Sequence, residues 1–130
     1  KFNPSEIAAR MPDERTWRSK IEEICGEHAH VIFEQQANKV FDKEQIQHRI
    51  ERIIAHEKEI KQVISGIVKY EPVLRKTLEI LGAPTTAAEL GISPADLKTS
   101  FLWAKEIRPK YVVLDLAYDL GILEQLADRL

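Results

Sequence analysis

Isoleucine residues recur at intervals of three and four through the middle of the chain, and this pattern predicts one long amphipathic helix. The stripe consists of Ile46, Ile50, Ile53, Ile60, Ile64 and Ile67. One of its positions, Glu57, is polar, while Ile54 and Val63 widen the apolar face. We predict a helix from Asp42 to Val68, about 40 Å long at a rise of ~1.5 Å per residue. The width of the stripe favours a central helix of a bundle over a two-stranded coiled coil.

Helical spacing and capping signals continue through the other segments of the chain. Further helices are predicted over residues 3–10, 72–81, 93–107, 112–120 and 123–130. Between Thr16 and Phe41 the pattern leaves open one kinked helix or two, because Gly26 weakens the middle of that segment. The β-branched pair Val112-Val113 is too short to predict a strand. We therefore predict an all-α fold, a multi-helix bundle with one long central helix, in a single helical domain that covers residues 1–130.

Three helix boundaries fall close together in the stretch GAPTTAAELGIS, which ends at Ser93. Gly82 stands where a left-handed C-terminal cap is expected, and Gly91 ends a very short helix. Thr86 and Glu89 have the spacing of a capping box. Ser93 precedes a proline and is expected to cap the next helix. The stretch therefore predicts a fixed corner instead of a flexible linker.

The composition is that of one globular domain with a core of its own. Of the 130 residues, 44% are hydrophobic and 31% charged, and the net charge is -2. This balance indicates neither nucleic acid nor an anionic membrane as a partner, and no apolar run is long enough to span a bilayer. The single cysteine, Cys25, and the lack of a signal-peptide pattern favour a cytoplasmic protein.

The corner and the segment IRPKYVVLDLAYDLGIL that follows it resemble the C-terminal part of glycerol-1-phosphate dehydrogenases. These enzymes belong to the metal-dependent, iron-containing alcohol dehydrogenase superfamily. The residues that fit the family pattern are Gly82, Ala83, Pro84, Thr85, Thr86, Glu89, Leu90, Gly91, Ile92, Ile107, Arg108, Tyr111, Leu114 and Leu116. Pro109-Lys110 and Val112 depart from it. The resemblance is good over about the last 50 residues and loose over the first 70.

The resemblance implies a parent protein that transfers a hydride between NAD(P)H and dihydroxyacetone phosphate, with a divalent metal ion polarising the carbonyl group. It places the dinucleotide-binding half, and the Asp and two His residues that hold the metal, N-terminal to this chain. The chain begins Lys1-Phe2 without a methionine, so we expect a segment of a longer protein whose partner is that N-terminal domain. Alone, the segment is expected to be inactive, with no catalytic, cofactor-binding or metal-ligating residue. Homo-oligomer formation is left open.

Arg108, Lys110 and Tyr111 gather where a predicted helix ends before a proline. Since the family's substrate carries a phosphate, the resemblance makes Arg108 a candidate contact for that phosphate. The alternative is that these basic residues only complement the negative end of the helix dipole.

The four histidines do not have the spacing of a metal site. His28 and His30 point to nearly opposite sides of a helix, and His48 and His56 lie two turns apart. Glu57 interrupts the isoleucine stripe, and two interpretations are open. Its carboxylate could be aimed into a cavity with an altered pKa, but we favour a side chain that reaches solvent and pairs with Lys61 one helical turn away.

A second function remains open alongside the dehydrogenase segment. The long isoleucine stripe would also suit a stand-alone helical module that binds a partner helix or associates with itself. The reading frame upstream of Lys1 distinguishes the two, because only the dehydrogenase requires a Gly-rich nucleotide-binding loop and an Asp…His…His set there.

Overall fold

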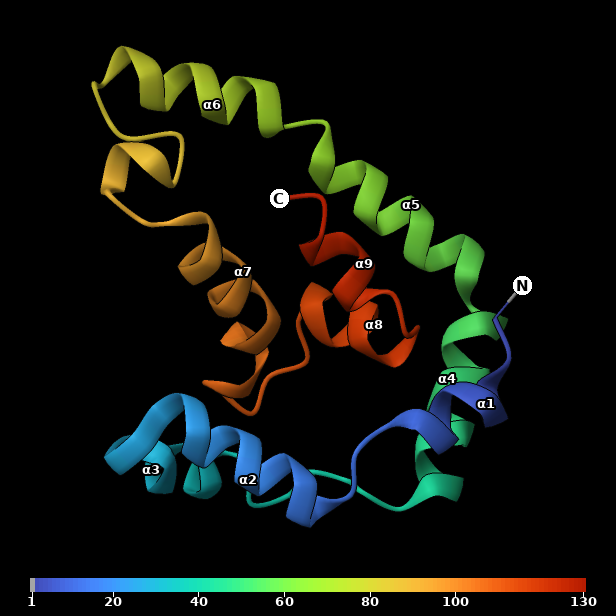
Figure 1. Ribbon diagram of the computed structural model, residues 1–130. Helices are drawn as coiled ribbons and strands as arrows, with labels where there is room; N and C mark the ends of the chain where they lie inside the picture. The colour runs from blue at the N-terminus through green and yellow to red at the C-terminus, as the bar shows by residue number, and fades with distance from the viewer. Residues whose placement is uncertain (1) are drawn as a thin grey trace.

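The computed structural model describes residues 2–130, and every regular element in this range is a helix (Figure 1). The α-helices are α1 (Pro4–Arg10), α2 (Glu14–Cys25), α3 (Ala29–Gln35), α4 (Lys43–Ala55), α5 (Glu57–Val68), α6 (Glu71–Ile80), α7 (Pro94–Trp103), α8 (Val113–Asp119) and α9 (Leu123–Ala127). Short 3-10 helices join some of them: η1 (Gly26–His28), η2 (Ala88–Leu90) and η3 (Ala104–Glu106). The predicted all-α class is confirmed.

The first part of the core lies where α1 packs against α4. Ala8 and Met11 meet Ile46 and Ile50 there, and Ile50 is 0% exposed. Tyr118 of α8 packs against the same cluster, so the C-terminal helices are anchored on the N-terminal ones.

The second part of the core surrounds Trp17 of α2. Trp17 is buried with Ile21 and Ala29, and its ring lies against Phe33 at a centroid distance of 5.6 Å. Trp103 of α7 packs against this cluster from the other half of the chain. Burying several aromatic side chains together is a large apolar contribution to stability.

The segment from Thr16 to Phe41 contains two separate α-helices. The backbone of Gly26 has a φ of 52°, which ends α2, and η1 intervenes before α3 begins. Of the two alternatives that the sequence left open, the structure therefore selects two helices.

The predicted helix from Asp42 to Val68 is present as α4 and α5, with only His56 between them. Helical hydrogen bonds reach His56 from both sides: its N–H donates to the Arg52 carbonyl at 3.1 Å, and its carbonyl accepts from Ile60 at 3.0 Å. Its backbone, at φ -104° and ψ 22°, is not helical, and α5 bends away from α4 there (Figure 1).

Helices α5 and α6, residues 57–80, form an arm that has no buried residue. Figure 1 shows this α5–α6 arm as one side of an open ring, with α8 and α9 inside the ring. Of the twenty large hydrophobic residues exposed in residues 2–130, twelve lie between 63 and 92. The isoleucine stripe is thus buried along α4 and largely uncovered along the arm.

The corner between α6 and α7 has the predicted caps. The Glu89 carboxylate accepts from the Thr86 N–H at 2.8 Å, and the Glu89 N–H donates to the Thr86 hydroxyl at 3.3 Å, which is the predicted capping box. Gly82 and Gly91 have φ of 67° and 71°, a left-handed conformation that favours glycine. Ser93 caps α7 as predicted.

Candidate functional site

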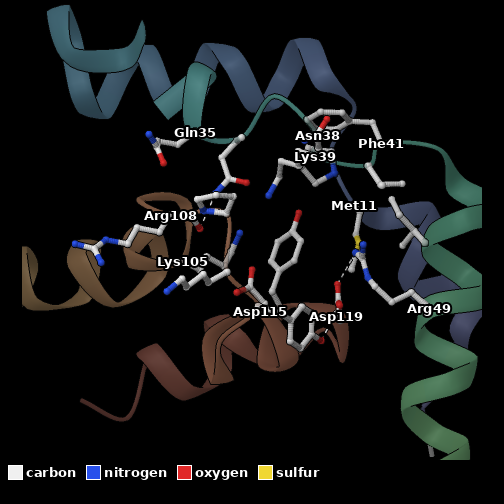
Figure 2. A pocket seen from close by; sticks show the side chains of 18 residues that line it. Met11, Gln35, Asn38, Lys39, Phe41, Arg49, Lys105, Arg108, Asp115 and Asp119 are labelled. Atoms are coloured by element: carbon white, nitrogen blue, oxygen red, sulfur yellow. Dashed lines mark hydrogen bonds and ion pairs between the residues drawn. The ribbon is translucent and has the colours of Figure 1, made fainter. Parts of the chain in front are cut away.

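A cavity of about 270 Å³ lies between the loop that follows α3 and the segment that runs from η3 into α8 (Figure 2). Five cationic side chains line it: Lys39, Arg49, Lys105, Arg108 and Lys110. Asp115 and Asp119 are the carboxylates in its lining. The cavity therefore carries an excess of positive charge in a chain whose net charge is -2. This excess makes the cavity a candidate site for an anion.

Glu106 lies behind the cavity wall and is the counterion of two lysines. It is 2% exposed. The Lys39 ammonium donates to both of its carboxylate oxygens, at 2.9 and 3.1 Å, and the Lys105 amine contacts the same carboxylate. Burial alone would raise the pKa of Glu106, but Lys105 and Lys39 outweigh burial and hold that pKa below its ordinary value.

A second ion pair closes the other side of the cavity. Arg49 of α4 donates to Asp119 of α8 at 2.7 Å, and the Tyr111 hydroxyl donates to the second oxygen of Asp119 at 2.9 Å. Burial, followed by the charge of Asp119, raises the pKa of Tyr111, so its hydroxyl stays protonated at neutral pH. The Nε–H of Arg49 is buried without an acceptor among residues 2–130, which leaves one donor available beside the cavity.

Local sequence explains how these side chains reach the site. Asp115 accepts from the Val112 N–H at 2.8 Å and so fixes the start of α8, whose next turn carries Asp119. The Gln36 amide donates to the backbone carbonyls of Glu106 and Arg108, at 2.9 and 3.1 Å, and joins the loop after α3 to the η3 segment.

Arg108, Lys110 and Tyr111, which the sequence analysis singled out at the end of a helix, all line this cavity. The guanidinium of Arg108 is directed away from the centre of the cavity in the conformation drawn in Figure 2. The contact of Arg108 with a phosphate therefore stays a prediction.

The floor of the cavity holds the ion pairs of Lys39 with Glu106 and of Arg49 with Asp119. The sequence analysis did not predict this floor, in part because η3 changes which side chains of the segment face the interior. Extending α7 in α-helical geometry placed Ile107 with the apolar residues, but this residue is 57% exposed. A 3-10 turn advances about 120° per residue instead of about 100°, and Lys105 and Glu106 are the side chains buried in η3. No short motif signals this exchange, and Lys39 lies 67 positions from Glu106.

The histidines lie apart from the cavity. His48 contacts Glu44 and Glu51 on the exposed side of α4, and the ring of His30 is hydrogen-bonded to the carbonyl of Glu27. Within residues 2–130, no three His, Cys, Asp or Glu side chains are grouped so as to hold a metal ion. Glu57 is paired with Lys61, as predicted.

Over the same residues, no helix combines the length and the apolar character needed to cross a membrane. Comparisons with protein-family models, curated proteins and solved structures gave no match for this chain, so the dehydrogenase resemblance stays a prediction from the C-terminal residues alone.

Proposed function

We propose that this chain is the C-terminal helical domain of a cytoplasmic, NAD(P)-linked and metal-dependent oxidoreductase that resembles glycerol-1-phosphate dehydrogenases. The observation that carries the proposal is the C-terminal pattern from Gly82 to Leu116. Two polar residues of this pattern make hydrogen bonds in the structure. Glu89 accepts from the backbone N–H groups of Thr85 and Thr86 in the corner, and the Tyr111 hydroxyl donates to Asp119 beside the cavity.

The cavity gives this domain a role toward the substrate. An excess of cationic side chains at a partly buried site favours binding of an anionic group, and the proposed substrate carries a phosphate. Arg108 stands at the rim, on a segment whose backbone accepts hydrogen bonds from Gln36. In this proposal Arg108 binds and orients the phosphate, and the cationic floor supports it.

The rest of the chemistry belongs to the N-terminal nucleotide-binding domain of the proposed parent. NAD(P) supplies the hydride, and a divalent metal ion polarises the carbonyl group. In this proposal the helical domain forms one wall of the interdomain cleft.

The proposal is tested by assaying NAD- and NADP-linked oxidation of glycerol 1-phosphate. The 130-residue chain alone should be inactive, and the protein translated from the complete reading frame should be active. An upstream frame without a Gly-rich loop and an Asp…His…His set would contradict the proposal.

Arg108→Ala in the complete protein tests the phosphate contact. We expect a higher KM for the phosphorylated substrate with a smaller change in kcat, because uniform binding is removed. Arg10→Ala is the matched control, since Arg10 is an exposed arginine on α1 whose ion-pair partner is Glu6, away from the cavity. Equal kinetics for the two variants would assign Arg108 to the helix end alone.

The alternative, a helical interaction module, is favoured by one observation. The α5–α6 arm leaves apolar side chains such as Ile67, Leu74 and Leu81 more than half exposed. A surface of this kind marks an interaction site in a monomer. The oligomeric state of the 130-residue chain can be measured by size-exclusion chromatography with light scattering. Self-association of the chain, together with a translation start at Lys1, would favour the module.

A further inference from the structure

We propose that Lys105 is a nucleophilic amine that takes up a small aldehyde or ketone bearing an anionic group, as a Schiff base inside the cavity. This inference concerns covalent chemistry of the chain itself, and it does not depend on the dehydrogenase proposal.

The position of Lys105 is unusual for a lysine. Its side chain is 3% exposed, although lysine is almost never buried unless it is paired. It nevertheless lines the cavity, whose rim includes the exposed residues Asn38, Arg108 and Lys110. A solute in the cavity therefore lies next to the Lys105 side chain.

The cluster of Lys39, Glu106 and Lys105 contains two amines and one carboxylate. If both lysines are protonated, the buried cluster carries an uncompensated positive charge, which burial penalises. The cluster is neutral when one amine is neutral. Lys39 is the more exposed of the two, with 18% of its side chain accessible, and it donates to both oxygens of Glu106. Lys105 is therefore the amine of this cluster that gives up its proton more readily.

The groups around Lys105 shift its pKa in opposite directions. Burial and the charge of Lys39 lower its pKa, while Glu106 and Asp115 raise it, and the net direction is downward. The ring of Tyr118, with its centroid 3.9 Å from the amine, also favours the charged form.

The remaining charged groups of the cavity are an ion pair and two cations at the rim. The ion pair of Arg49 with Asp119 is neutral as a unit. Arg108 and Lys110 line the rim of the cavity. Lysines beside another cation are the amines that proteins use for Schiff-base chemistry.

The anionic substituent of the ligand follows from the same charges. With Lys105 neutral, Lys39 is balanced by Glu106, and the cations at the rim still exceed the acidic side chains there. A phosphate or carboxylate on the carbonyl compound would neutralise this remaining positive charge. A cavity of about 270 Å³ suits a small molecule, because sites for drug-sized ligands occupy ~300–1,000 Å³.

The reaction needs no reagent beyond the two partners. The lone pair of the Lys105 nitrogen attacks the carbonyl carbon, a C–N bond forms, and the C=O electron pair moves to oxygen. Glu106 accepts a proton from the new ammonium and returns it to the oxygen, which gives the neutral carbinolamine. The second N–H proton passes through Glu106 to the hydroxyl group, which leaves as water as the C=N bond forms, so the products are the imine and one water molecule.

Pyridoxal 5′-phosphate, an anionic aldehyde, is a direct probe of the wild-type chain. The protein is treated with a substoichiometric amount at pH 7, the imine is reduced with cyanoborohydride, and the modified lysines are identified by peptide mass spectrometry. We expect Lys105 to be modified several-fold faster than the exposed Lys58, since a lowered pKa increases the fraction of free amine at pH 7. Inorganic phosphate should slow the modification of Lys105 more than that of Lys58.

Two variants connect the result to the cluster. Lys105→Arg should remove the fast site and leave Lys58 unchanged. Lys39→Met removes the second cation, so it should slow modification of Lys105 at pH 7 and move its pH dependence upward. Modification of Lys58 with no product at Lys105 in the wild-type protein would overturn the proposal. Equal rates and equal pH dependence at both lysines would overturn it as well.

Discussion

Replacing Glu106 by glutamine tests whether the buried ion cluster stabilises the fold. Glutamine has nearly the same shape, but it leaves the amines of Lys39 and Lys105 without a counterion. At a separation of 2.9 Å, one amine–carboxylate pair is worth about 6 kcal/mol at an effective dielectric constant of about 20. Desolvation of the charges offsets part of this, and breaking a buried pair typically costs ~3–5 kcal/mol. We therefore expect Glu106→Gln to lower the free energy of unfolding by about 3–5 kcal/mol.

The measurement is urea denaturation of the 130-residue chain followed by circular dichroism at pH 7. Glu59→Gln is the matched control, because Glu59 is exposed on α5, and it should change stability by less than about 0.5 kcal/mol. A loss below about 1 kcal/mol for Glu106→Gln would refute the reasoning, since it would mean that the amines find solvent when the carboxylate is removed.

The pH dependence of this variant provides a second check. The pKa of Glu106 is lower in the folded chain than its ordinary value of 4.5, so its contribution to stability is present above that value and is lost as the pH falls through the folded pKa. The wild-type chain should therefore lose stability on acidification more steeply than Glu106→Gln. Parallel curves would show that Glu106 binds protons equally in both states.

Two further predictions concern the core and the corner. Ile50→Ala should lower the free energy of unfolding by about 2–5 kcal/mol, because Ile50 is fully buried against Ala8 and Met11. Ile60→Ala should lower it by about half as much or less, because Ile60 is only partly buried. Equal shifts of the urea midpoint would contradict this ranking. In the corner, the backbone N–H of Thr85, followed by the groups of Thr86, lowers the pKa of Glu89, so its cap should weaken only as the pH falls below the usual range of a glutamate. The amide resonances of Thr85 and Thr86 in an NMR titration should shift together with that ionisation, and a midpoint at or above the ordinary glutamate value would contradict the cap.

The corner could be read from the sequence because its determinants are local. Thr86 and Glu89 are three positions apart, and Gly82, Gly91 and Ser93 each act on the residues next to them. The helical class followed for the same reason, from spacing that repeats within each segment.

The candidate site needed the tertiary structure. Its floor joins Lys39 to Glu106 and Arg49 to Asp119, pairs that are 67 and 70 positions apart. Periodicity also could not show that η3 turns Ile107 outward, or that the stripe that buries Ile50 on α4 is left uncovered farther along. Whether an apolar face is covered depends on the partners that reach it, and those partners are not encoded in the face itself.

The single non-helical residue between α4 and α5 has a consequence for how the chain opens. Beyond His56, the arm has no buried side chain, so little apolar contact opposes its separation from α8 and α9. Segments of this kind exchange their amide protons through local unfolding, at a free energy well below that of global unfolding. The amides of α5 and α6 should therefore exchange as one early unit while those of α4 stay protected. A partner that covered the arm would add the missing contacts and so would slow this exchange.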